Sequence, residues 1–506
     1  PPMRAAARAG AKGVMAAYNE IDGVYCHANK ELLTDVLRGE LGFQGLVMAD
    51  GTALDRLDAL TGDPAASGAL GLAAGVDVSL WDEAFSRLEE AVARGLVPES
   101  EVDRACLRVL ELKFARGLFE HPTLDETPPQ VFSYAQHPES LELARRSPVL
   151  LKNQGILPLK PCKAAVLGPN GDSLYNQLGD YTPPQRPGSG VTLVQGLRGL
   201  LGEENVTFAQ GCPVCGEDEG GFPAALAAAK EADVVILALG GSSSRFAGAS
   251  FDVNGAAILD GPVQMDCGEG VDSPTLGLPG SQEALAEAVF ALGKPVVTAV
   301  IAGRPYAIPE LAERSEALLY AFYPGPLGGQ ALAEILTGAV SPSGRLPASL
   351  PRSVGYLPCY YDQKASAAGP ETPWLYPFGF GLGYTRFAAE DVRFPEAFSL
   401  VQLQAGRRAE VHFTLRNVGD RPGAAVPQLY LHDVQASTAR RVKELKTFAR
   451  VELAPGEARE VTLTLGTEEL SLWDRDMRFV PEAGDFRLML EEGGALLAEG
   501  VFTLTE

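Results

Sequence analysis

The stretch that decides the fold of the N-terminal part is Gly45–Gly51, which reads GLVMADG. A run this short and this apolar, with a glycine at each end, is typical of a strand buried on both faces of a parallel sheet. Asp50 closes the run, and (β/α) folds place their chemistry at the C-terminal tips of such strands. Capping of the following helix is the alternative role for Asp50, because aspartate is a good N-cap.

Two further βα units frame this strand. Apolar runs predict a parallel strand on either side of it, and apolar residues at helical spacing predict the helices. The expected strands are residues 11–19, 45–51 and 73–80, and expected helices include residues 29–41 and 83–94. Right-handed crossovers then bring Tyr18, Asp50 and Ser79 to one rim.

Three βα units cannot close a barrel, because closure without open edges needs eight. The chain begins Pro-Pro-Met-Arg, and the helix expected over residues 4–11 has no strand before it. We therefore expect residues 1–122 to be the last three units of a partial (β/α)8 barrel, with an open edge beside residues 14–17. An edge of this kind is an aggregation hazard.

Charge and composition limit the partners. The formal net charge of −23 argues against nucleic acid, since phosphate binding needs basic patches, and it suits a neutral substrate such as a sugar. No stretch approaches the roughly 18 apolar residues of a membrane-spanning helix, so no membrane partner is expected. With no visible targeting segment we expect a cytoplasmic protein, with secretion left open because the N-terminus is expected to be missing.

The cysteines and histidines predict neither disulfides nor a metal site. Seven cysteines are an odd count spread along the chain. Cys212 and Cys215 form a single CxxC pair, and the five histidines supply no second pair of ligands beside it. We expect no metal, no cofactor and two buried or half-buried thiols.

A second α/β module is expected over residues 147–352, after a linker and helix over residues 123–146. Buried strands alternating with helices indicate an α/β sandwich with a largely parallel, doubly wound sheet. The expected strands are residues 164–168, 233–240, 295–301 and 317–322, and the expected helices are residues 224–231 and 281–292. Gly240 and Gly241 follow a strand but lack the full GxGxxG pattern, so nucleotide binding is not predicted.

The period of the apolar residues changes to two near the C-terminus. After a connecting segment over residues 353–390, residues 391–506 contain six or seven alternating strands, which indicates an immunoglobulin-like or fibronectin type III-like β-sandwich. Pro427 would confine the strand over residues 426–431 to a sheet edge. No group of catalytic residue types occurs there, so a structural or docking role is expected.

Six stretches, in order, resemble signatures of glycoside hydrolase family 3. They are residues 13–23 (GVMAAYNEIDG), 42–50 (GFQGLVMAD), 150–159 (LLKNQGILPL), 324–329 (PGPLGG), 342–347 (PSGRLP) and 376–385 (YPFGFGLGYT). The resemblance covers the whole chain. It implies the order barrel, α/β sandwich and fibronectin type III-like domain of β-glucosidases and β-xylosidases.

The resemblance also implies roles for particular residues. Asp50 matches the family nucleophile, and Glu269, within residues 267–280 (CGEGVDSPTLGLPG), matches the acid/base on a loop of the second domain. Tyr18 lies within the first motif, and its hydroxyl is an expected hydrogen-bond donor to Asp50 in the substrate-binding rim. Read from the residues alone, flanking glycines let a backbone present Glu269 at a sharp turn, although a solvated loop carboxylate is the alternative.

Two positions depart from the family pattern, and three charged residues are candidates for support. Ser273 stands where the family often has arginine, and Gly51 follows the nucleophile where many members have tryptophan. The candidate supporting residues are Asp55, Arg56 and Asp77, with exposed helical charges as the alternative for the first two.

The implied function is a retaining, exo-acting β-glycosidase that releases terminal β-D-glucose or xylose from β-glucosides and β-linked oligosaccharides by double displacement. Two alternatives stay open: a truncated, non-catalytic carbohydrate-binding or scaffold fragment, and a phosphorylase or transglycosylase with the same two carboxylates. Turnover of an aryl β-glucoside with and without phosphate separates the three. Homo-oligomer formation is left open.

Overall fold

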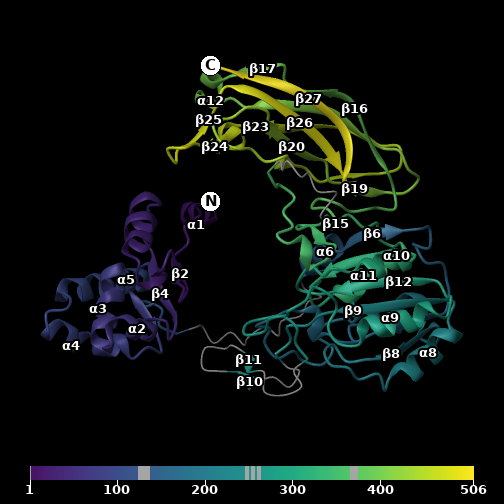
Figure 1. The fold of residues 1–506 in the computed structure, drawn as a ribbon, viewed down its shortest axis with the longest axis horizontal. Coiled ribbons are helices and arrows are strands. Elements are labelled where there is room, and N and C mark those ends of the chain that lie inside the picture. Colours follow the sequence, from purple (N-terminus) through teal and green to yellow (C-terminus); the bar gives the residue numbers. More distant parts are fainter. Residues whose placement is uncertain (1, 124–136, 246–249, 252–256, 259–263, 365–373) are drawn as a thin grey trace. The chain divides into compact units, whose positions relative to one another are not determined.

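The computed structural model describes residues 2–123, 137–245, 250–251, 257–258, 264–364 and 374–506 (Figure 1). The chain divides into two compact units, Pro1–Val131 and Phe132–Glu506, which are treated separately below as unit 1 and unit 2. The linker expected over residues 123–137 lies largely outside the described residues.

Unit 1 contains the three expected parallel strands. Its sheet has the order β1-β4-β5, and the strands run over Gly13–Ala16, Leu46–Gly51 and Val78–Leu80. The main helices are α1 (Pro2–Arg8), the π-type helix η2 (Glu31–Glu40), α3 (Pro64–Ala74), α4 (Leu88–Ala93) and α5 (Glu99–Ala115). The βα alternation predicted from the apolar runs is therefore confirmed.

The expectation that the β4 strand is buried on both faces is wrong for this unit. Val47 and Ala49 are fully buried in a cluster with leucines of η2, whereas Met48 on the other face is 38% exposed. Met15 on neighbouring β1 is 57% exposed. Among the described residues of unit 1, η2 packs against the face of β4 that carries Val47 and Ala49, and Met15 and Met48 are exposed.

A buried carboxylate, Asp77, fixes the register of β4 beside β5. Its two oxygens accept charge-assisted hydrogen bonds from Arg38 of η2 and Arg108 of α5, each at 2.6 Å. The Val47 N–H also donates to Asp77 Oδ2 at 2.9 Å, and the Asp77 N–H donates to the Val47 carbonyl at 2.7 Å. Asp77 therefore joins a strand and two helices, which is a structural role rather than a direct role in the chemistry.

Replacing Asp77 by alanine should lower the free energy of unfolding of unit 1 by about 3 kcal/mol, because Arg38 and Arg108 would lose a buried partner. Asp35→Ala is the matched control, because Asp35 lies on η2, the helix that carries Arg38. Asp35 pairs with Lys30 at 2.9 Å, but both side chains are more than half exposed, so its loss should stay below about 1 kcal/mol. Urea unfolding measures both, and equal losses would contradict the role of Asp77.

Unit 2 begins with α6 (Pro138–Arg146) and a six-stranded sheet of order β6-β13-β12-β9-β7-β8. The strands are β6 (Val149–Asn153), β7 (Ala164–Leu167), β8 (Val206–Ala209), β9 (Val234–Gly240), β12 (Val296–Ile301) and β13 (Ala317–Phe322). All neighbours pair in parallel except β6 and β13, which are antiparallel. The largely parallel sheet is confirmed, and β6 and β8 add two strands that the apolar runs did not identify.

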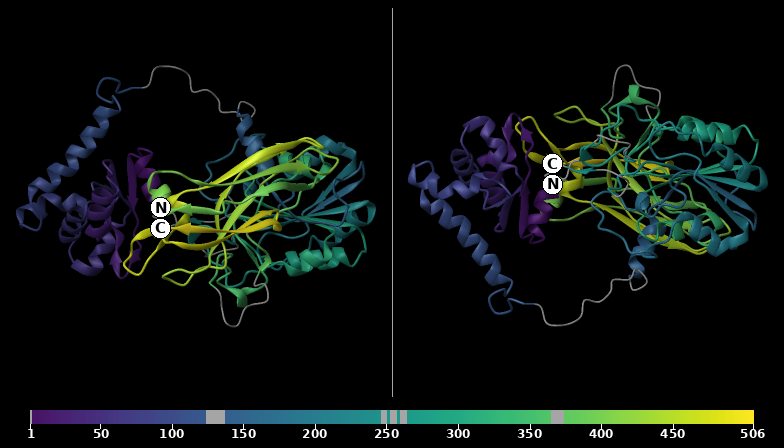
Figure 2. Two further views of the ribbon diagram at one scale, coloured as in Figure 1. Left: turned by 90° about the horizontal axis from the view of Figure 1, so that it is seen from above. Right: turned by 90° about the horizontal axis from the view of Figure 1, so that it is seen from below.

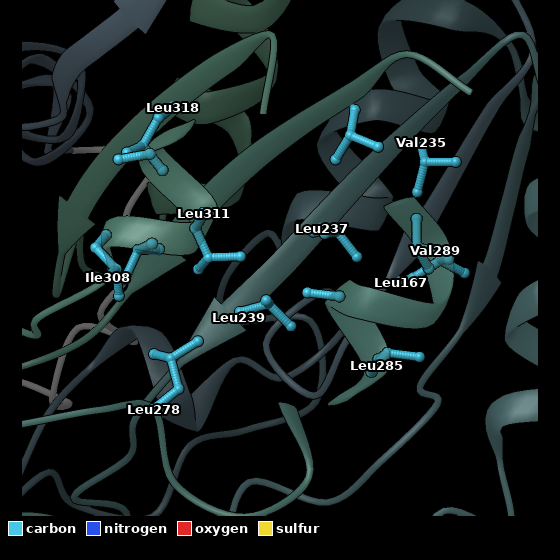
Figure 3. Close-up of a cluster of buried hydrophobic side chains, with 14 of the residues drawn as sticks. Leu167, Val235, Leu237, Leu239, Leu278, Leu285, Val289, Ile308, Leu311 and Leu318 are labelled. Atoms are coloured by element: carbon cyan, nitrogen blue, oxygen red, sulfur yellow. The ribbon is translucent and has the colours of Figure 1, made fainter. Parts of the chain in front are cut away.

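Helices cover both faces of this sheet, as a doubly wound fold requires. They are α7 (Leu193–Leu201) and α11 (Gly328–Thr337) on one face, and α8 (Phe222–Glu231), α9 (Gln282–Phe290) and α10 (Pro309–Arg314) on the other. In Figure 3, Leu237 and Leu239 of β9 lie near Leu285 and Val289 of α9. Strand β9 is buried along its whole length because it lies at the centre of the sheet.

The C-terminal part of unit 2 is a β domain with a three-stranded sheet, β16-β18-β23, and a five-stranded sheet, β17-β27-β26-β20-β21. Their bounds are β16 (Phe387–Arg393), β17 (Ala397–Ser399), β18 (Ala409–Asn417), β20 (Gln428–Asp433), β21 (Glu444–Phe448), β23 (Ala458–Leu465), β26 (Gly484–Glu492) and β27 (Ala495–Thr505). The paired strands β26 and β27 run side by side in all the views (Figures 1 and 2).

Two expectations about this domain need correction. The strand after Pro427 is not at an edge, because β20 pairs with both β21 and β26. The strand begins at Gln428, so the ladder does not need the N–H that Pro427 lacks. The domain boundary expected at residue 391 also falls inside β16, which pairs with β18 from Phe387 onward.

A buried ion pair attaches the β domain to the α/β part of unit 2. Arg345, in the loop after α11, donates to Glu492 at the end of β26, and each side chain is only 9% exposed. Glu492 also accepts from the Val426 N–H at 2.8 Å, and Arg345 donates to the carbonyl of Gly344 at 2.9 Å. Burial raises the pKa of Glu492, while the guanidinium acts in the opposite direction.

Candidate active site

Asp50 lies at the C-terminal tip of β4, as predicted, and its side chain is half-buried. Its Oδ1 accepts a hydrogen bond from the Gly51 N–H at 2.7 Å. The pairing of β4 with β5 shifts register between Met48 and Gly51, so the strand end that carries Asp50 is irregular. The next helical turn, η3 (Leu54–Leu57), has Ala53 as its N-cap residue, and the Ala53 N–H donates to the main-chain carbonyl of Asp50 at 3.1 Å.

Two other aspartates hold the loops around Asp50. Asp82, which is 8% exposed, accepts from the N–H groups of Leu54 at 2.7 Å and Leu80 at 3.1 Å. Asp55 accepts from the N–H groups of Glu83 at 3.0 Å and residue 84 at 2.9 Å. The loop after β4 thus supports the loop after β5 and is supported by it. Burial raises the pKa of Asp82.

Tyr18 lies two residues after β1, beside an arginine. The Arg56 guanidinium carbon is 4.4 Å from the centroid of the Tyr18 ring, a cation–π contact. The donation expected from the Tyr18 hydroxyl to Asp50 is not among the hydrogen bonds of the described residues, in which Asp50 instead accepts from Gly51. The strand that Tyr18 follows, β1, does pair in parallel with β4, which carries Asp50, as the βα pattern predicted.

Glu269 lies in unit 2, half-buried on a loop whose two flanking glycines have left-handed backbone. Gly268 has φ +116° and Gly270 has φ +77°, so the sharp turn expected from these glycines is confirmed. The Glu269 N–H donates to Asp180 Oδ2 at 3.1 Å. A Cβ on Gly268 would come within 2.9 Å of the same carboxylate oxygen, so the loop approaches Asp180 closely.

Arg245 supplies the cation beside this loop, and the sequence analysis did not identify it. Its Nη2 is 3.4 Å from Glu269 Oε2, its Nε is 2.5 Å from Asp180 Oδ1, and its guanidinium lies 3.8 Å from the Tyr181 ring centroid. It therefore stabilises a negative charge on Glu269. The Ser273 hydroxyl donates to the carbonyl of Thr275, two residues further along the chain, at 3.0 Å.

A buried polar network anchors the start of the Glu269 loop. Asp266 accepts from the Ser242 N–H at 2.8 Å and from the Tyr306 hydroxyl. The Tyr323 hydroxyl lies 3.3 Å from Cys267 Sγ and 2.9 Å from Ser243 Oγ. Burial raises the pKa of both tyrosines and of the Cys267 thiol, so these groups stay protonated near neutral pH and serve as hydrogen-bonding groups.

The other candidate motifs take structural roles. Cys212 is buried and Cys215 half-buried, both are free, and burial raises their pKa values to about 11 and about 12. A Cβ on Gly241 would lie 2.1 Å from the Tyr306 hydroxyl, so protein atoms already fill the space against this glycine. Within the described ranges, no group of three or more His, Cys, Asp or Glu could hold a metal ion. Nor does any described helix have the length and apolar character to cross a bilayer.

Comparison with known proteins identifies these domains. Residues 1–112 match the Glycosyl hydrolase family 3 N terminal domain, residues 148–384 the Glycosyl hydrolase family 3 C-terminal domain, and residues 425–493 a Fibronectin type III-like domain. Together they define a carbohydrate hydrolase of mixed α/β architecture with a C-terminal β domain.

The chain belongs to glycosyl hydrolase family 3, and it is a β-glycosidase. It is 32% identical to the periplasmic beta-glucosidase of Salmonella typhimurium, over 100% of this chain and 69% of that protein. It is 34% identical to a beta-xylosidase of Formosa agariphila, over 96% of this chain and 68% of that protein. A solved beta-glucosidase of Listeria innocua superposes with a TM-score of 0.89 at 31% identity, over 100% of this chain and 69% of that one.

A buried histidine beside the rim of unit 1 makes the stability of this unit depend on pH. His27 is fully buried, its Nδ1 lies 3.0 Å from the carbonyl of Ala17, and its Nε2 has no hydrogen-bond partner among the described residues. Burial lowers the pKa of His27 below its usual 6.5. As pH falls below about 6.5, the unfolded chain takes up a proton that the folded unit does not, so stability falls.

We therefore expect the melting temperature of the protein to fall between pH 7.5 and pH 5.5, and His27→Leu to weaken that fall because the titrating group is gone. His121→Leu is the control, since His121 is exposed. Thermal unfolding at both pH values measures the effect. A His27→Leu variant that keeps the full pH dependence would contradict this assignment.

Proposed function

We propose that this β-glycosidase is retaining and exo-acting, and that it releases terminal β-D-glucose or xylose from β-glucosides and β-linked oligosaccharides. The observation that carries the proposal is Asp50, a half-buried carboxylate at the C-terminal tip of a parallel strand. The names of the Salmonella beta-glucosidase and the Formosa beta-xylosidase support this choice of sugars. A Listeria beta-glucosidase solved in complex with glucose, with a TM-score of 0.88, supports glucose in particular.

In the proposed first step, Asp50 attacks the anomeric carbon and Glu269 gives its proton to the leaving oxygen. Arg245 favours the ionised form of Glu269, while the Asp180 carboxylate, which pairs with the same guanidinium at 2.5 Å, acts in the opposite direction. In the proposed mechanism the ionised Asp50 adds a negative charge that favours the protonated form of Glu269, because two like charges at close range do not both ionise readily.

In the proposed second step, formation of the glycosyl–enzyme ester removes the negative charge of Asp50. Glu269, which gave its proton to the leaving oxygen in the first step, is now a carboxylate stabilised by Arg245, and it can take a proton from water as a general base. Arg245 thus supports the base form, and its contact with Glu269 suits the second step better than the first.

We also propose that the parallel sheet of unit 1 is part of a (β/α)8 barrel. Its three strands, alternating with helices, have the local arrangement of such a barrel, and residues 1–112 match the N-terminal family domain. The other expected domain boundaries and the cytoplasmic location stay predictions, and the Salmonella relative is a periplasmic protein by its name.

Asp50→Ala should abolish turnover of every β-glucoside, since no glycosyl–enzyme forms without the nucleophile. Glu269→Ala should act differently on 2,4-dinitrophenyl β-glucoside, whose leaving group needs no proton. The glycosyl–enzyme should still form, its hydrolysis should slow by about 10²–10⁴-fold, and added azide should restore the rate and yield a β-glycosyl azide. Steady-state rates and product analysis measure these effects in the full-length protein.

Asp180→Asn is a useful comparison because Asp180 contacts the Glu269 loop without being a candidate for the chemistry. Its loss should reduce the rate without giving azide rescue. Equal losses in the Asp50 and Glu269 variants, with no azide rescue, would show that Glu269 is not the acid/base. A sugar phosphate as the main product when phosphate is added would favour the phosphorylase alternative.

A second expectation concerns geometry. A retaining mechanism places the two carboxyl groups about 5–5.5 Å apart when substrate is bound, whereas an inverting one needs about 6.5–9.5 Å. A crystal structure of the full-length protein with a bound inhibitor would measure the separation between Asp50 and Glu269. A separation in the longer range, with inverted product stereochemistry by NMR, would contradict the retaining mechanism.

A further inference from the structure

Trp81 is an exposed aromatic residue placed directly beside the residue that follows Asp50. It comes immediately after β5, and its side chain is 79% exposed. A Cβ built on Gly51 would lie 3.1 Å from Cζ3 and 3.2 Å from Cε3 of the Trp81 ring. The indole therefore occupies the space where a side chain at position 51 would begin.

The backbone of Trp81 is held in a conformation that tryptophan rarely adopts. Its φ is +59°, in the left-handed region, which costs free energy for a residue with a bulky side chain. The conformation is maintained on both sides of the residue. The Thr52 N–H donates to the Leu80 carbonyl at 2.9 Å, and the Leu80 N–H donates to Asp82 Oδ2 at 3.1 Å.

Core packing does not account for this arrangement. A strained indole that leaves most of its surface in solvent contributes little to the hydrophobic core of unit 1, and backbone strain of this kind is concentrated at functional sites. Pyranose rings and aryl groups present apolar faces that can pack on an indole. The ring lies next to the position of the reacting bond, because Asp50 must reach the anomeric carbon.

The exposure of the Trp81 ring also indicates whether it contacts the terminal sugar or the leaving group of the substrate. An exo-acting enzyme encloses the terminal sugar, and the remainder of the substrate extends toward solvent. A ring that is 79% exposed suits the extending part. We propose that Trp81 is a specificity-determining residue that stacks on the leaving-group sugar or aryl ring, in the place that Gly51 leaves without a side chain. This assignment rests on the proposed function.

The test compares substrates that differ only in the leaving group. β-Glucosyl fluoride has no ring to stack, whereas a β-linked glucose disaccharide and an aryl β-glucoside both have one. Trp81→Ala should lower kcat/KM about tenfold for the disaccharide and the aryl glucoside, mainly through KM, and change the value for the fluoride less than about twofold. Trp81→Phe should restore most of the loss, because it keeps an aromatic face.

Trp473→Ala is the matched control, since Trp473 is also exposed, at 56%, but lies in the β domain of unit 2. It should leave the ratio between disaccharide and fluoride unchanged. Retained turnover of the fluoride shows that the Trp81 variants are folded. Equal losses for disaccharide and fluoride, or no loss for either, would overturn the assignment while leaving the proposed function standing. Failure of the unchanged full-length protein to turn over the fluoride would overturn both.

Discussion

The placement of Asp50 depends on the burial of a carboxylate that does not react. Asp77 is almost free of solvent contact, and it is stable there only because two guanidinium groups and the Val47 N–H meet its oxygens. A shift of β4 by one residue would separate these groups and leave charges buried without partners. The geometry of the strand tip is therefore a consequence of the ionic cluster beneath it.

The two loops that follow β4 and β5 are also held in place by carboxylates that do not react. Asp82 and Asp55 each satisfy backbone N–H groups of the other's loop. Such reciprocal bonds make the loops cooperative, since neither can move without exposing the N–H groups of the other. This rigidity is what allows an unfavourable backbone angle at Trp81 to persist.

The features that the sequence predicted correctly are those that depend on neighbouring residues in the chain. The apolar runs located β4 and β9, and the position of Asp50 followed from the end of its run. Strands β6 and β8 were missed because they are short or end in polar residues, and their strand character comes from pairing with β13 and β7. The centrality of β20 was missed because Pro427 was counted within the strand instead of before it.

The residues of the candidate site also divide into those that the local sequence predicted and those that it did not. The glycines around Glu269 predicted a sharp turn, because glycine alone tolerates that backbone freely. Arg245 and Asp180 were not predicted, since they meet Glu269 only through the tertiary fold. One signal was available: Arg245 lies a few residues beyond the tip of β9, an edge at which doubly wound sheets gather functional groups.

The ion pair between Arg345 and Glu492 bears on how the β domain can change during evolution. Each partner is nearly buried, and each belongs to a different domain. Loss of the β domain through a premature stop codon or a recombination event would leave Arg345 without its counter-charge. Exchange with an unrelated β-sandwich would have the same effect unless the incoming domain offered a carboxylate at the same place. The two domains are therefore expected to be retained or lost together during evolution, because each supplies one partner of this buried ion pair.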